Sequence, residues 1–89
     1  MSAHASHPEI IKRLNRAKGH LASIITMLEE RRGCLDIAQQ LQAVEKAVTN
    51  AKKALVHDHI DHCLEHAVKA QPSNAEETIR EFKEITKYL

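Results

Sequence analysis

A stretch without glycine or proline, residues 34–70, constrains the fold of this 89-residue chain more than any other feature. Within it, apolar side chains recur every three or four residues, which places them along one side of a helix. They are Ile37, Leu41, Val44, Val48, Ala51 and Leu55. The stretch therefore predicts one continuous helix of about 30 to 35 residues, longer than a typical globular helix.

A shorter amphipathic helix is predicted to precede this stretch. Apolar side chains recur at helical spacing over residues 10–28, and the helix predicted from Pro8 to its end near residues 31–33 has about six turns. Pro8 suits the first turn of such a helix, and Gly33 occupies a usual stop position after its end. Residues 1–7 show no periodicity, and we expect them to form a disordered arm.

The end of the chain predicts a third, short helix. A break over residues 71–74 includes Pro72, and apolar side chains at helical spacing then continue to Leu89. The sequence thus predicts an all-α fold, a three-helix protomer with a long second helix, as a single domain over residues 1–89. Because the first and third helices are too short to cover the second, we expect the long helices of different chains to pair.

Histidine and cysteine side chains cluster near the end of the long helix. Four of the seven histidines and one of the two cysteines lie within residues 55–66. His59 and Cys63 are one helical turn apart on one face, which is the spacing of a pair of metal ligands. An isolated pair of this kind is more often structural, with the cysteine acting as a small buried hydrophobe.

The other cysteine, Cys34, can join this pair only across two chains. It lies 25 residues before His59, which is about 37 Å along one helix. If two copies pair antiparallel, Cys34 of the partner subunit lies beside His59 and Cys63. The two-fold axis then passes near Ala47 and Val48, in a stripe of small side chains that lets two helices approach closely. The sequence therefore predicts an antiparallel dimer with two equivalent metal sites.

Two thiolates and one imidazole form a ligand set that favours Cu(I), which accepts soft ligands and three-coordinate geometry. Ni(II) or Co(II) is the alternative, and either ion would need further nitrogen or oxygen donors, such as His4, His7 or the terminal amine. We assign no role to the remaining histidines of the cluster, which are more often solvated than ligating. These are His57, His62 and His66.

Positive charge is concentrated at the start of the chain, although the whole chain has a net charge of only +1. Residues 1–34 carry six basic and three acidic side chains, whereas residues 56–89 carry four basic and seven acidic ones. A basic helix face on its own is usually only solvated. The concentration of charge nevertheless makes the first half a candidate anion-binding surface.

Three segments together resemble the CsoR-type family of bacterial transcriptional repressors, which includes copper sensors. They are residues 13–21 (RLNRAKGHL), residues 33–44 (GCLDIAQQLQAV) and residues 57–63 (HDHIDHC). The spacing from Cys34 to His59 to Cys63 is that of the copper branch. The resemblance covers nearly the whole chain and implies an antiparallel dimer forming a four-helix bundle, usually as a dimer of dimers, that is, a homotetramer.

The resemblance also implies a function: the metal-free protein binds operator DNA, and Cu(I) releases it to allow expression of copper efflux or resistance genes. It assigns the ligands to Cys34, His59 and Cys63, with Glu81 as a supporting glutamate outside the ligand set. DNA contacts, mostly to phosphates, are expected from seven polar or basic side chains. These are Lys12, Arg13, Arg16, Lys18, Asn50, Lys52 and Lys53.

Two other functions stay open: a nickel- or cobalt-sensing repressor of the same family, and a metal-storage or metal-delivery bundle that does not bind DNA. An enzyme is not expected, because the sequence contains no glycine-rich phosphate loop and no catalytic carboxylate pair. We expect a cytoplasmic protein without a membrane partner, since no signal peptide and no apolar run of membrane-spanning length is present.

Overall fold

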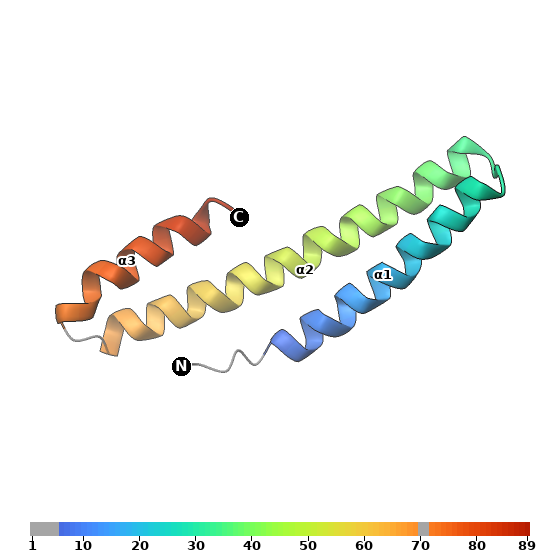
Figure 1. Cartoon of the computed structure of the whole chain (residues 1–89). Helices are drawn as coiled ribbons and strands as arrows, with labels where there is room; N and C mark the ends of the chain where they lie inside the picture. The colour runs from blue at the N-terminus through green and yellow to red at the C-terminus, as the bar shows by residue number, and fades with distance from the viewer. Residues whose placement is uncertain (1–5, 70–71) are drawn as a thin grey trace.

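The computed structural model describes residues 6–69 and 72–89, and this part of the chain forms three α-helices (Figure 1). α1 (His7–Glu29) and α2 (Cys34–Lys69) form an antiparallel hairpin, and α3 (Pro72–Thr86) folds back along the end of α2. Within the described residues, α1 and α3 each pack against α2 and not against each other. The predicted all-α fold with a long second helix is confirmed.

The interface between α1 and α2 is a narrow line of buried apolar side chains. They recur every seven residues on each helix: Ile10, Ala17 and Ile24 on α1, and Ile37, Val44 and Ala51 on α2. Ile24, Ile37 and Val44 pack together, and Met27 covers them. A seven-residue repeat keeps one stripe of a helix in contact with its neighbour over many turns, so it accounts for the long, straight hairpin.

Side-chain hydrogen bonds connect the N-terminal half of the chain to α2 beside this line. Nε2 of His20 lies 2.6 Å from Oε1 of Gln40, and the hydroxyl of Ser6 donates to the carboxylate of Asp58 at 2.7 Å. Both bonds are partly shielded from solvent, and each joins residues at least 20 positions apart in the chain. The second bond attaches the start of α1 to the residue that precedes His59.

A second apolar stripe on the same two helices is exposed. The sequence pattern alone did not separate this stripe from the buried one. We call it the exposed seam. Its members, between 39% and 58% exposed, are Ile11, Leu14, Leu21, Ile25 and Leu28 on α1 and Leu41, Val48 and Leu55 on α2. Two helices bury only the stripe between them, so one chain leaves this second stripe in contact with solvent.

The turn between α1 and α2 closes two residues earlier than the sequence predicted. The amide of Arg31 donates to the carbonyl of Leu28 at 3.1 Å, and the amide of Arg32 donates to that of Met27 at 3.0 Å. This pair of bonds is a Schellman cap, which requires one residue in the left-handed conformation. That residue is Arg31, with φ of 58°, whereas Gly33 does not have a positive φ.

The predicted N-terminal arm and the predicted start of the third helix also differ from the structure. Residues 1–5, which make up most of the predicted arm and include His4, lie outside the described residues, as do residues 70–71. His7 belongs to the helix, since α1 begins there. α3 already begins at Pro72, within the predicted break. None of the described helices is long and apolar enough to cross a membrane.

We expect Arg31→Gly to raise the free energy of unfolding by up to about 1 kcal/mol, because glycine adopts a left-handed conformation without the clash that a Cβ causes. Urea unfolding of the metal-free protein at fixed protomer concentration measures the change. Arg32→Gly is the matched control and should destabilise, because it loses the 3.3 Å ion pair with Asp36 and relieves no strain. Equal losses in the two variants would contradict this account of the turn.

Candidate metal centre and basic groove

Three potential metal ligands from one chain converge where α3 packs on the end of α2. A ring nitrogen of His59, the Sγ of Cys63 and a carboxylate oxygen of Glu81 all lie within 4.8 Å of one another. α2 places His59 and Cys63 one turn apart, and α3 brings Glu81 to them by folding back. Cys63 is buried, His59 is half-buried and Glu81 is exposed, so the cluster is open to solvent on the α3 side.

Cys63 lies in an apolar setting between α2 and α3. It lines a small pocket of about 180 Å³ together with Leu64, Thr78, Ile79 and Phe82. Burial raises the pKa of the Cys63 thiol above its ordinary value, and the negative charge of Glu81 raises it further. The thiol is therefore protonated at neutral pH in the metal-free protein, and a bound cation must displace that proton.

Cys34 is at the opposite end of α2. It is the first residue of the helix, and its side chain is exposed. Since α2 is continuous, Cys34 lies about 37 Å along the helix from His59. A single chain therefore places the predicted ligands in two separate groups, with His59 and Cys63 together and Cys34 apart from them.

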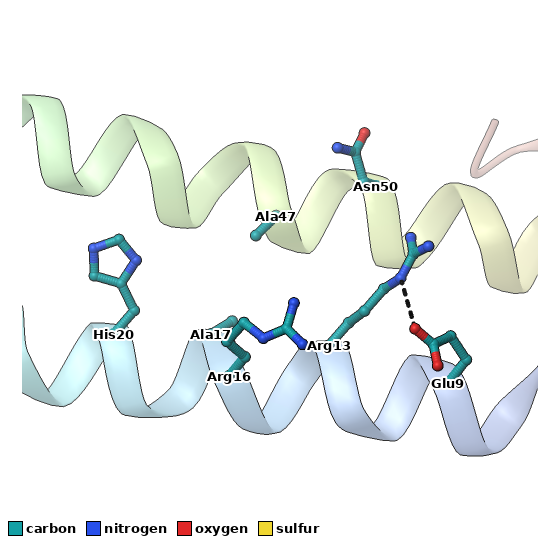
Figure 2. Close-up of a pocket in the computed structure, with 7 residues that line it drawn as sticks. All are labelled: Glu9, Arg13, Arg16, Ala17, His20, Ala47 and Asn50. Atoms are coloured by element: carbon teal, nitrogen blue, oxygen red, sulfur yellow. Dashed lines mark ion pairs between the residues drawn. The ribbon is translucent and has the colours of Figure 1, made fainter.

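A groove between α1 and α2 brings together three of the predicted DNA-contact residues: Arg13, Arg16 and Asn50. The groove has a volume of about 360 Å³. Figure 2 shows Arg13 extending from α1 toward α2, with His20 pointing toward α2 further along α1. Its other lining residues are Glu9, Ala17 and Ala47. Four of the predicted contacts are exposed and do not line it: Lys12, Lys18, Lys52 and Lys53.

Glu9 is a groove residue that the sequence did not identify. Its carboxylate lies 4.0 Å from Nε of Arg13, one helical turn away (Figure 2). The pair is exposed, so its contribution to stability is small. The negative charge of Glu9 nevertheless has a local electrostatic effect. It reduces the positive potential that Arg13 presents to an anion. The four-residue spacing was visible in the sequence, but the position of both side chains in a groove depends on where α2 packs.

Comparison with known proteins gives consistent matches. Residues 6–88 match a family described as metal-sensitive transcriptional repressor. The chain is 37% identical over 83 residues to the copper-sensing transcriptional repressor CsoR of Bacillus subtilis, covering 89% of this chain and 80% of that protein. It is 40% identical over 58 residues to CsoR of Mycobacterium ulcerans, covering 65% of this chain and 50% of that protein.

A structural match extends over the whole chain. The nickel-responsive transcriptional regulator InrS superposes with a TM-score of 0.82 at 28% sequence identity, covering 100% of this chain and 99% of that one. Both relatives are copper-sensing repressors whereas the structural neighbour is nickel-responsive, so the similarities do not select the metal. The chain spans about half the length of the mycobacterial relative.

The fold and its two sites define a class of all-helical proteins in which a cluster with a thiol and an imidazole shares a long helix with a basic groove. The chain belongs to the family of metal-sensitive transcriptional repressors of the CsoR type. The resemblance predicted from the sequence is confirmed. These relatives are transcriptional repressors and regulators, and the expectation that the protein is not an enzyme is confirmed with it.

We expect Glu81→Gln to speed the alkylation of Cys63 in metal-free protein, because loss of the carboxylate charge lowers the pKa of the thiol and increases the thiolate fraction. In a Cys34→Ser background, Cys63 is the only thiol, so the iodoacetamide rate against pH reports its titration. Glu76→Gln makes the same charge change on α3, outside the cluster, and is the control. Identical titration midpoints in all three proteins would show that Glu81 does not act on the thiol.

Proposed function

We propose that the protein is a copper-responsive repressor, which binds operator DNA when metal-free and leaves it when Cu(I) binds. The observation that carries this proposal is the division of the ligands between the two ends of α2. In an antiparallel pair of chains, Cys34 of the partner subunit meets His59 and Cys63. The resulting two thiolates and one imidazole suit three-coordinate Cu(I).

The exposed seam supports the pairing of two chains. It runs along both α1 and α2, and Val48, which is 45% exposed, lies near the midpoint between Cys34 and the His59–Cys63 pair. Two hairpins that pack through this seam bury its apolar side chains and form a four-helix bundle. The homodimer therefore completes the metal site and covers the apolar surface at the same time, and a dimer of dimers follows from the family resemblance.

The basic groove and the exposed lysines of α1 and α2 supply the DNA-binding surface. The groove lies between two long helices and presents guanidinium groups, so its contacts are mainly with phosphates and with the shape of the DNA grooves. In this function the protein acts in the cytoplasm and controls copper efflux or resistance genes. Metal and DNA oppose each other, and each weakens the binding of the other by the same factor.

Arg13→Ala should weaken operator binding and reduce the slope of log affinity against log salt by about 1, because one phosphate contact and its released counterion are lost. Fluorescence anisotropy with a labelled duplex from upstream of the gene, at several salt concentrations, measures both quantities. Arg80→Ala, on α3 and outside the groove, should change neither. A wild-type protein that binds no DNA at modest salt would instead support a metal-storage bundle.

Cu(I) should release the wild-type protein from the same duplex as binding approaches one ion per protomer, whereas Cys34→Ala and Cys63→Ala should stay bound. Each variant alone lacks a complete site. When the two are refolded together, random pairing produces heterodimers with one intact site, so the mixture recovers about a quarter of the wild-type Cu(I). Competition with a chromophoric chelator measures this recovery.

The mixture experiment separates sites shared between chains from sites within a chain. Refolding each variant with itself is the control and should recover no tight Cu(I) binding. If the mixture also recovers none, the two cysteines do not meet across a dimer. If wild-type protein binds Cu(I) fully and remains on DNA, the metal site is intact but the copper-sensing function is wrong.

A further inference from the structure

Glu81 is close enough to His59 and Cys63 to bind the same ion. Ligands of a tetrahedral Zn²⁺ ion, at about 2.0 to 2.3 Å from the metal, lie about 3.5 Å from one another. The three atoms of this cluster are within 4.8 Å of one another without any ion to draw them together. Side-chain movements of about 1 Å therefore bring all three into one coordination shell.

Nothing else in the described part of the chain occupies the carboxylate of Glu81. It makes no hydrogen bond or ion pair with any side chain that the structure describes, whereas Glu84, one turn further along α3, pairs with Lys87 at 3.0 Å. A carboxylate held beside a thiol and an imidazole, and engaged with no lysine or arginine among the described side chains, is available to a cation.

The donor set of the complete site then depends on whether Glu81 takes part. Without it, Cys34 of the partner subunit, His59 and Cys63 provide two sulfurs and one nitrogen. With it, a hard oxygen is added and the set becomes four-coordinate. Zn²⁺ and Co²⁺ accept thiolate, imidazole and carboxylate together, whereas Cu(I) prefers soft ligands and gains little from a carboxylate.

We propose that Glu81 is a direct ligand for divalent ions of the zinc type and that it leaves Cu(I) three-coordinate. Glu81 thereby determines how tightly the site holds divalent ions relative to Cu(I). The inference rests on the proposed function only for the fourth donor, Cys34, since the other three donors come from one chain. The proposed role of Glu81 also makes the position of α3 depend on which metal is bound, because Glu81 is the α3 residue of the cluster and α3 packs on α2.

The test compares Zn²⁺, Co²⁺ and Cu(I) on the full-length wild-type protein and on Glu81→Gln. Competition with chromophoric chelators should show Zn²⁺ and Co²⁺ affinity falling at least about tenfold in the variant, the scale expected when a metal-site residue is lost. Cu(I) affinity should stay within about twofold, because carboxylate is a poor ligand for that ion. The visible absorption of bound Co²⁺ should change in intensity as the coordination changes.

Controls distinguish a ligand from a group that only supports His59. Glu76→Gln makes the same charge change on α3 and should leave all three affinities unchanged, and Glu81→Asp keeps the charge but shortens the reach. A glutamate that only orients His59 would weaken Cu(I) and Zn²⁺ together, since both ions use that imidazole. Parallel losses, or no loss of Zn²⁺ affinity, would overturn the proposal.

Hydrogen exchange provides an independent measurement. Zn²⁺ should slow the exchange of α3 amides in the wild-type protein, because Glu81 ties α3 to α2, and it should not do so in Glu81→Gln. Cu(I) should have little effect on α3 in either protein. Equal protection of α3 by both ions would contradict the inference. A wild-type protein that binds neither ion would instead contradict the proposed function.

Discussion

The continuity of α2 is the constraint on which the rest of the structure depends. Over 36 residues it carries Cys34 at its first turn, the groove residue Asn50 in its middle and the His59–Cys63 pair toward its end. Because a helix is stiff and rises about 1.5 Å per residue, these groups cannot approach one another within one chain. A metal site that uses both cysteines therefore has to be shared between two chains.

The same helix connects the candidate metal site to the basic groove. Asp58 precedes His59 and accepts a hydrogen bond from Ser6, which attaches the N-cap of α1 to the turn of α2 that carries His59. α1 carries Arg13 and Arg16 in the groove. In the proposed function, a metal ion that draws His59 toward another chain moves this attachment point, and α1 changes its position relative to α2 with it.

Local sequence patterns predicted the bounds of the helices well. They predicted less well the turn between helices and the side chains that different helices bring together. The absence of helix-breaking residues was enough to predict α2 almost to its last residue. The α1–α2 turn was less accurate, because glycine preference pointed to Gly33 while the hydrogen bonds of the cap placed the left-handed residue at Arg31. The role of Glu9 depends on the position of another helix, and its sequence spacing to Arg13 alone carries no such information.

The sequence by itself determined the three helices, the pairing of His59 with Cys63 on one face, and the wide separation of Cys34 from that pair along one helix. These follow from helix periodicity and rise, which are local properties. Glu81 was expected beside that pair only from the family resemblance, and the tertiary structure decided how close it lies and that one of the two apolar stripes stays exposed. Both depend on how α3 and α1 pack against α2, and packing between distant segments has no counterpart in local spacing.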